Sequence, residues 1–74
     1  MNELVYILEA AKEHCILQNM WWRSFKETGD QRDYYLYREE YGCVVGLLKA
    51  YEIISGKHIP CWNFAIDEEL AKIA

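Results

Sequence analysis

The chain lacks the segments that would direct it into or across a membrane. Its most continuous apolar run, 43–48, is far shorter than a bilayer span. The start, Met1-Asn2-Glu3, has no basic flank before an apolar segment, so no secretory signal is visible. Three cysteines cannot all pair within one chain, and without such a signal we expect reduced thiols. These absences favour a cytoplasmic protein with no membrane partner.

Basic charge is also scarce. Eight Lys and Arg residues stand against twelve Asp and Glu, giving a formal net charge of −4. Half of the basic residues lie near Gly29, where Glu27, Asp30 and Asp33 are interleaved with them. Nucleic-acid affinity depends largely on Lys and Arg contacts to phosphates. We therefore expect no nucleic-acid partner and rank a helix-turn-helix protein low.

Motifs of catalysis and metal binding are missing. The sequence has no Gly-rich phosphate loop, no nucleophile elbow and no Glu-x-x-His pair, so we expect neither catalysis nor a cofactor. His58 and Cys61 form the one short-spaced His/Cys pair, whereas structural zinc needs four convergent ligands. Cys15 and Cys43 fall on apolar faces, where free cysteine acts as a small hydrophobe. The sequence predicts no metal site.

What the chain does contain is two apolar stripes with the same four-three spacing, which marks one side of a helix. Folding back at Gly29 brings the stripes into register. Their members are Leu4, Leu8, Ala11, Cys15, Gln18, Trp22 and Phe25 on the first, and Tyr34, Tyr37, Tyr41, Val44, Leu48, Tyr51 and Ser55 on the second. The register pairs Phe25 with Tyr34, Trp22 with Tyr37, Cys15 with Val44, and Leu8 with Tyr51.

The sequence therefore predicts a single all-α domain over 1–74. Its core is a long antiparallel helical hairpin of helices at about 3–28 and 30–55, followed by a short C-terminal helix at about 64–73. Asn2 and Asp30 suit the N-caps of the long helices, and Gly29 and Gly56 suit their C-terminal ends. Asn63 or Asp67 is expected to cap the third helix.

The composition, 53% apolar and 15% aromatic, exceeds what one hairpin can bury. Stripes beside the seam form a second apolar face, which the third helix or a second subunit is expected to cover. The members of these stripes are Ile7, Ala10, His14, Leu17 and Trp21 on the first helix, and Leu36, Cys43, Leu47, Ala50 and Ile54 on the second. We favour a homodimeric four-helix-type bundle.

Tyrosines occupy seam positions where leucine is usual, and a buried phenol needs a hydrogen-bond partner. Gln18 lies opposite Tyr41 and is expected to supply one. An aromatic-lined groove for a planar ligand is the alternative to a closed core. Gly42 and Gly46 leave a bare patch on the second helix, which we interpret as a place of close contact with the third helix, a second subunit or a target.

The leading functional hypothesis is a non-enzymatic protein that binds another protein through an aromatic and apolar face. The residues expected to form the site are Trp21, Tyr35, Gly42, Gly46 and Trp62, with Arg23 and Arg38 at the rim. A short, aromatic-rich helical hairpin with an odd cysteine count looks like many small proteins of bacteriophages and mobile elements, some of which inhibit host factors. The alternative is a small-ligand binding or sequestering protein, with aromatic rings stacked on a planar anion such as a nucleotide and Arg23, Arg32 or Arg38 meeting its charge.

Overall fold

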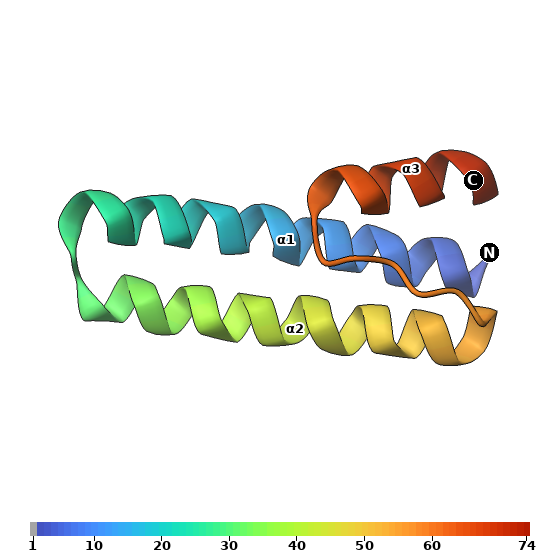
Figure 1. The fold of residues 1–74 in the computed structure, drawn as a ribbon, viewed down its shortest axis with the longest axis horizontal. Helices are drawn as coiled ribbons and strands as arrows, with labels where there is room; N and C mark the ends of the chain where they lie inside the picture. The colour runs from blue at the N-terminus through green and yellow to red at the C-terminus, as the bar shows by residue number, and fades with distance from the viewer. Residues whose placement is uncertain (1) are drawn as a thin grey trace.

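A computed structural model describes residues 2–74 and consists of three helices (Figure 1). Helix α1 spans Glu3–Thr28, α2 spans Gln31–Ser55 and α3 spans Asn63–Ile73. The two long helices lie antiparallel, and α3 returns along α1 at the end away from the turn (Figure 1). The all-α hairpin with a short third helix is confirmed.

The helix ends follow from local chemistry. Asn2 accepts a hydrogen bond from the Leu4 amide at 2.9 Å, and Asp30 accepts one from the Arg32 amide at 2.9 Å. Gly29 ends α1 with φ of 69°, a left-handed conformation that costs glycine little. Its amide donates to the Phe25 carbonyl at 2.7 Å, which closes the last turn.

The start of α3 differs from the expectation. Trp62 is the N-cap residue, and its side chain makes no capping hydrogen bond. Asn63 is already the first helical residue, and its buried Oδ1 has no hydrogen-bond partner among residues 2–74. Neither Asn63 nor Asp67 caps this helix, so that prediction is wrong. The chain enters α3 from Trp62, whose backbone is extended, after Ile59 has been buried in the core.

The predicted register is present in the structure. The rings of Trp22 and Tyr37 are 4.9 Å apart between centroids, and those of Phe25 and Tyr34 are 5.3 Å apart. Nearer the chain ends, mostly aliphatic residues from all three helices and the loop form the buried core, together with one tyrosine and one cysteine. Its members are Leu8, Ala11, Cys15, Val44, Leu48, Tyr51, Ile59 and Ile66.

Helix α3 covers one side of the hairpin and only part of its length. Lys12 pairs with Asp67 at 2.8 Å, and Ile16 and Asn19 lie beside Asn63 at the start of α3. His14 is two residues from Lys12 and therefore points about 160° away from it around α1. We call the side that α3 occupies the α3 side, and the side of His14 the far side. The expectation that the third helix covers the stripe of His14, Leu17 and Trp21 is wrong.

Candidate functional site

The part of the hairpin beyond α3 holds a row of stacked aromatic rings, which we call the aromatic row. Its members are Trp22 and Phe25 on α1 and Tyr34, Tyr37 and Tyr41 on α2. Neighbouring ring centroids are 4.9–6.2 Å apart with tilted planes, the range that aromatic pairs prefer. Trp22 and Tyr41 are still 40% and 42% exposed, so the row is a surface as well as a core.

The partner expected for Tyr41 is not there. The Oε1 atom of Gln18 is buried and has no hydrogen-bond partner among the described residues. Tyr41 instead keeps contact with water through its exposed side, which removes the need for a buried acceptor. The predicted Gln18–Tyr41 hydrogen bond is therefore wrong.

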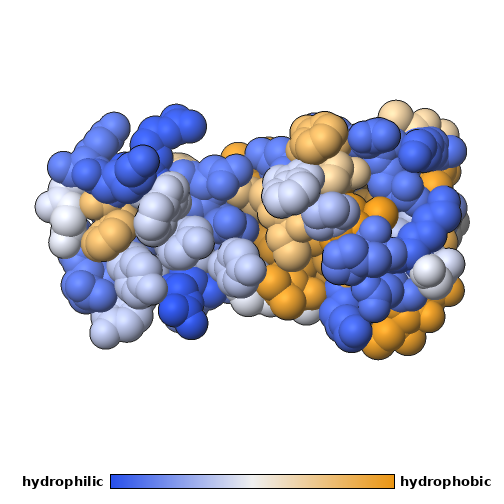
Figure 2. Space-filling view, viewed as in Figure 1, coloured by the Kyte–Doolittle hydropathy of each residue, from blue (hydrophilic) through white to orange (hydrophobic). Residues whose placement is uncertain are grey.

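Exposed apolar side chains continue the aromatic row toward α3. Ile16 and Met20 on α1 and Val45 on α2 are all large and exposed. Ile16, Met20 and Arg23 line a hollow of about 310 Å³ that Asn63 closes at the start of α3. In Figure 2 the half of the visible face toward the turn is mostly pale and blue, whereas orange gathers around the loop and α3. This part of the surface combines aromatic faces and aliphatic side chains with the cations Arg23 and Arg38.

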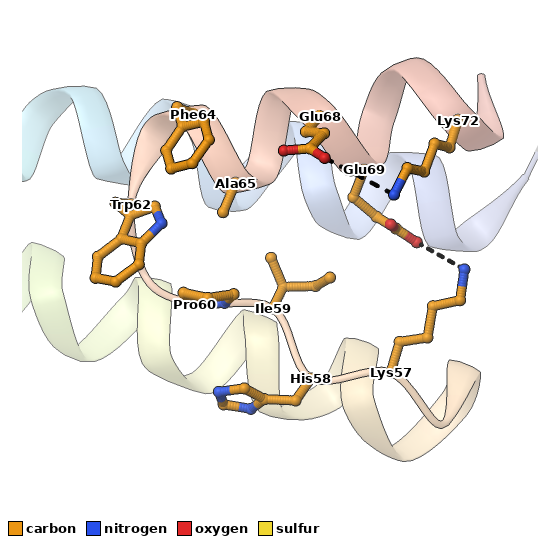
Figure 3. A pocket seen from close by; sticks show the side chains of 10 residues that line it. All are labelled: Lys57, His58, Ile59, Pro60, Trp62, Phe64, Ala65, Glu68, Glu69 and Lys72. Carbon is orange, nitrogen blue, oxygen red and sulfur yellow. Dashed lines mark hydrogen bonds and ion pairs between the residues drawn. The ribbon is translucent and has the colours of Figure 1, made fainter.

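A second depression lies between α3 and the loop that precedes it, with a volume of about 520 Å³. Trp62 and Phe64 stand at one end of this groove, and Lys57, Glu69, Glu68 and Lys72 lie at the other (Figure 3). Lys57 pairs with Glu69 at 3.3 Å and Lys72 with Glu68 at 3.9 Å. The two ammonium groups are thus offset by two carboxylates.

Glu69 also joins the third helix to the hairpin. The Tyr51 hydroxyl donates a hydrogen bond of 2.7 Å to Glu69 Oε2, and both side chains are buried. Burial and the bond to this carboxylate raise the pKa of Tyr51 to about 12. The same hydrogen bond, with help from Lys57, lowers the pKa of Glu69. This pair satisfies polar atoms inside the fold and is a structural element of α3 docking.

The site residues predicted from the sequence lie on different parts of the surface. Arg23 lines the hollow beside Met20, and Trp62 lines the groove of α3. Trp21 is half-buried on the far side, in the same stripe as His14. Tyr35 is exposed, and Arg38 donates a hydrogen bond to the Tyr34 hydroxyl at 3.3 Å.

Gly42 and Gly46 lie on the outer surface of α2. A Cβ added at either glycine meets nothing within 4 Å among residues 2–74. Helix α3 packs along α1 and its backbone makes no close approach to α2. The expected contact of these glycines with the third helix is therefore wrong, and their contact with a second subunit or a target stays a prediction.

The two residues considered for metal binding, His58 and Cys61, lie in different surroundings. His58 Nδ1 donates to Glu52 Oε1 at 2.7 Å on the surface. The Cys61 thiol is half-buried near Cys15, and burial raises the pKa of both thiols. All three cysteines are free. The sequence interpretation did not foresee the contact of His14 with Glu40, in which His14 Nδ1 donates to Glu40 Oε2 at 2.5 Å across the hairpin.

The groove and the arginines bear on the alternative of a planar anionic ligand. Arg23, Arg32 and Arg38 do not line the α3 groove, and the lysines that do are paired with carboxylates. This arrangement gives an anion no unpaired cation in the groove. The ligand-binding alternative stays a prediction that these contacts do not favour.

Comparisons with protein-family models, with curated proteins and with solved structures found no match to this chain. Among residues 2–74, none of the helices has both the length and the apolar character needed to cross a bilayer. The function must be inferred from the surface itself.

Proposed function

We propose that this chain is a non-enzymatic interaction protein that binds a helix of another protein on the α3 side of the hairpin, beyond the start of α3. The observation behind this proposal is the uneven cover of the hairpin. The half near the chain ends has a third helix over its core, whereas the half near the turn presents the aromatic row, with exposed Ile16 and Met20 beside the start of α3.

The dimensions favour a helix as the occupant. Helix α1 has 26 residues and is about 39 Å long, while the 11 residues of α3 span about 16 Å. About 22 Å of α1 therefore stays uncovered, enough for about four turns of a second helix in line with α3. Helix α3 already shows that a helix packs here through apolar residues such as Ile66 and Leu70.

The chemistry of the surface indicates the partner's composition. Aromatic and methionine side chains are common anchors at protein interfaces. An amphipathic helix with apolar residues at i, i+3, i+4 and i+7 would place them against Trp22 and Tyr41, with Met20 at the edge of the hollow beside Arg23. Arg23 stands at the edge of the hollow, where an acidic residue of the partner helix would pair with it.

The test is affinity capture from the source cell with matched surface variants, followed by binding measurements on the purified partner. Met20→Glu changes an exposed side chain on the proposed surface, and Ile53→Glu changes an exposed side chain on the outer side of α2. Met20→Glu is expected to weaken binding about 10-fold or more, and Ile53→Glu to leave it unchanged. Binding that survives Met20→Glu, or is equally lost in Ile53→Glu, would contradict the proposal.

Gly46→Leu extends this test to the outer side of α2. The added side chain meets open space in the monomer, so the fold is expected to persist. If this variant loses the partner while Met20→Glu keeps it, the functional surface lies at the glycines and not at the aromatic row.

The same proposal includes a homodimer, formed through the far side. Leu17, Trp21, Cys43, Leu47 and Ile54 lie there, and Leu17 and Ile54 are exposed. A second copy packed against this side gives a four-helix-type bundle and leaves the aromatic row free. Sedimentation of the purified protein tests it, because a compact monomer at tens of micromolar would remove the dimer.

A further inference from the structure

Three metal-binding side chains meet on the far side, near the middle of both long helices. A nitrogen of His14, a carboxylate oxygen of Glu40 and the Cys43 sulfur all lie within 4.8 Å of one another. His14 comes from α1, and the other two come from α2. We call these three residues the His14–Glu40–Cys43 cluster.

The backbone holds the cluster in place. Glu40 and Cys43 are three residues apart on one helix, a spacing that sets two side chains on the same side. His14 approaches them from the opposite helix, where its Nδ1 is already 2.5 Å from Glu40 Oε2. The two long helices are joined by a turn capped at both sides, so this approach does not depend on a mobile loop.

The spacing suits a small cation. In a tetrahedral zinc site with bonds of about 2.0–2.3 Å, neighbouring ligand atoms are about 3.3–3.7 Å apart. The His14–Glu40 contact would open by about 1 Å from its hydrogen-bonded distance, and the sulfur would move in by a similar amount. Shifts of this size are within the reach of side-chain rotation about the helix backbones.

The donor types select the class of metal. Thiolate, imidazole and carboxylate are the three ligand types that zinc takes in proteins. Calcium and magnesium require six or more ligands that are mostly oxygen, which this cluster does not provide. The His14 and Glu40 side chains are 36% and 21% exposed and Cys43 is exposed, so an ion can reach the cluster from solvent.

We propose that His14, Glu40 and Cys43 bind one divalent transition-metal ion of the zinc class. The Cys43 thiol loses its proton on binding, and the imidazole binds through one ring nitrogen while its proton stays on the other. Three protein ligands leave a fourth position open toward the far side, for water or a donor from a bound molecule. The three ligands come from one chain, and in the homodimer proposed above the open position would face the second copy.

The test is a titration of reduced, metal-free protein with Zn²⁺ against a chromophoric chelator. We expect one ion per chain and a rise in the thermal unfolding midpoint, because a metal that binds only the folded chain stabilises it. Cys43→Ser and His14→Gln are each expected to lower the affinity for Zn²⁺ by at least about 100-fold. Loss of a residue that only hydrogen-bonds to a metal ligand already lowers affinity by about 10–100-fold, and these variants remove the ligand itself. Glu40→Gln is expected to weaken it as well.

The matched controls come from the loop. Cys61→Ser and His58→Gln remove the same residue types away from the cluster and are expected to leave the affinity unchanged. Titration with Co²⁺ adds a direct readout, since a thiolate-to-metal charge-transfer band should appear and be absent in Cys43→Ser. Folding of every variant is checked by circular dichroism.

Several results would overturn the site. These are no binding in several-fold excess of Zn²⁺, affinity unaffected by Cys43→Ser, or binding that depends on His58 and Cys61. An affinity that Glu40→Gln does not change would remove the three-ligand set. Cys43 is exposed, so its replacement tests the site without disturbing the core.

Discussion

The two halves of the hairpin are built from different kinds of side chain. In the half under α3, aliphatic residues such as Leu8, Val44 and Ile66 are almost completely buried. In the half near the turn, the same seam positions hold the aromatic row, and Trp22 and Tyr41 stay substantially exposed. The comparison shows that the seam of a two-helix hairpin becomes a closed core only where a third element covers it.

Tyrosine illustrates the difference most directly. Tyr51 lies in the covered half, where its hydroxyl has no water and bonds to Glu69 at 2.7 Å. Tyr41 lies in the open half, is 42% exposed and makes no such hydrogen bond among the described residues. The open half can therefore use large rings with polar tips at little cost, whereas the covered half supplies one carboxylate for its one buried tyrosine.

The largest expected effect tests where the stability resides. Leu8→Ala removes a completely buried side chain of the covered half and is expected to lower the free energy of unfolding by about 2–5 kcal/mol. Tyr41→Ala, at an exposed position of the open half, should cost less than half as much. Urea unfolding followed by circular dichroism measures both. Equal losses would show that the open half is as well packed as the covered half.

The open half is expected to depend on one buried carboxylate near the turn. Asp33 accepts hydrogen bonds from Ser24 Oγ at 2.6 Å and from Thr28 Oγ1 at 3.3 Å. Asp33→Ala removes this acceptor from two hydroxyl groups and is expected to cost about 1–3 kcal/mol in unfolding free energy. The exposed neighbour change Glu27→Ala serves as the control in the same urea experiment. A loss no larger than that of the control would show that the turn is held by its glycine and caps alone.

A smaller effect of opposite sign is expected on the outer side of α2. Gly46→Ala adds a methyl group in open space and removes a glycine from a helix interior, so it should stabilise the fold by about 1 kcal/mol. The thermal unfolding midpoint measures this gain, with Gly29→Ala as the contrast. Gly29 has φ of 69°, where alanine is strained, and its replacement should destabilise. A loss of stability in Gly46→Ala would indicate a contact at this glycine, as within a dimer.

The smallest expected effect concerns acid and the docking of α3. The Tyr51 hydrogen bond and Lys57 hold the pKa of Glu69 below 4.5 in the folded chain. Its contribution to stability is therefore present above about pH 4.5 and is lost as the pH falls through the lowered pKa. Glu69→Gln should show a weaker decline of unfolding free energy with acid than the parent chain. Glu52, whose pKa His58 and Lys49 also lower, contributes the remainder and is separated by Glu52→Gln. Parallel declines in the parent and Glu69→Gln would contradict this role.

Much of the fold is predictable from the sequence because the two stripes and their glycines are local signals. The register of Phe25 with Tyr34 and Trp22 with Tyr37 follows from folding the chain back at Gly29. The side on which α3 packs does not follow, because the apolar flank of Ile7, Leu17 and Trp21 predicts the far side, whereas α3 packs on the side of Lys12. On that side Lys12 pairs with Asp67, and Ile59 of the loop is buried in the core.

The candidate sites were less accessible from the sequence. The flanking stripes already placed His14 and Cys43 on one face, but each residue by itself fits an apolar flank. Glu40 turns them into a cluster, and its contact with His14 depends on the rotation of both helices. The prediction that Gly42 and Gly46 form a patch without side chains on the surface of α2 is correct. Two small residues on a helix do not identify the molecule that packs against them.

Asn2 and Ala74 lie at the same end of the molecule, opposite the turn at Gly29 (Figure 1). A tether fused to either terminus will therefore hold the protein by its α3 end and present Trp22 and Tyr41 outward. Immobilisation on a sensor chip through a terminal tag leaves the proposed helix-binding surface free. A fluorescent label at Lys26, in the last turn of α1, would lie close to that surface and report directly on binding of a partner there.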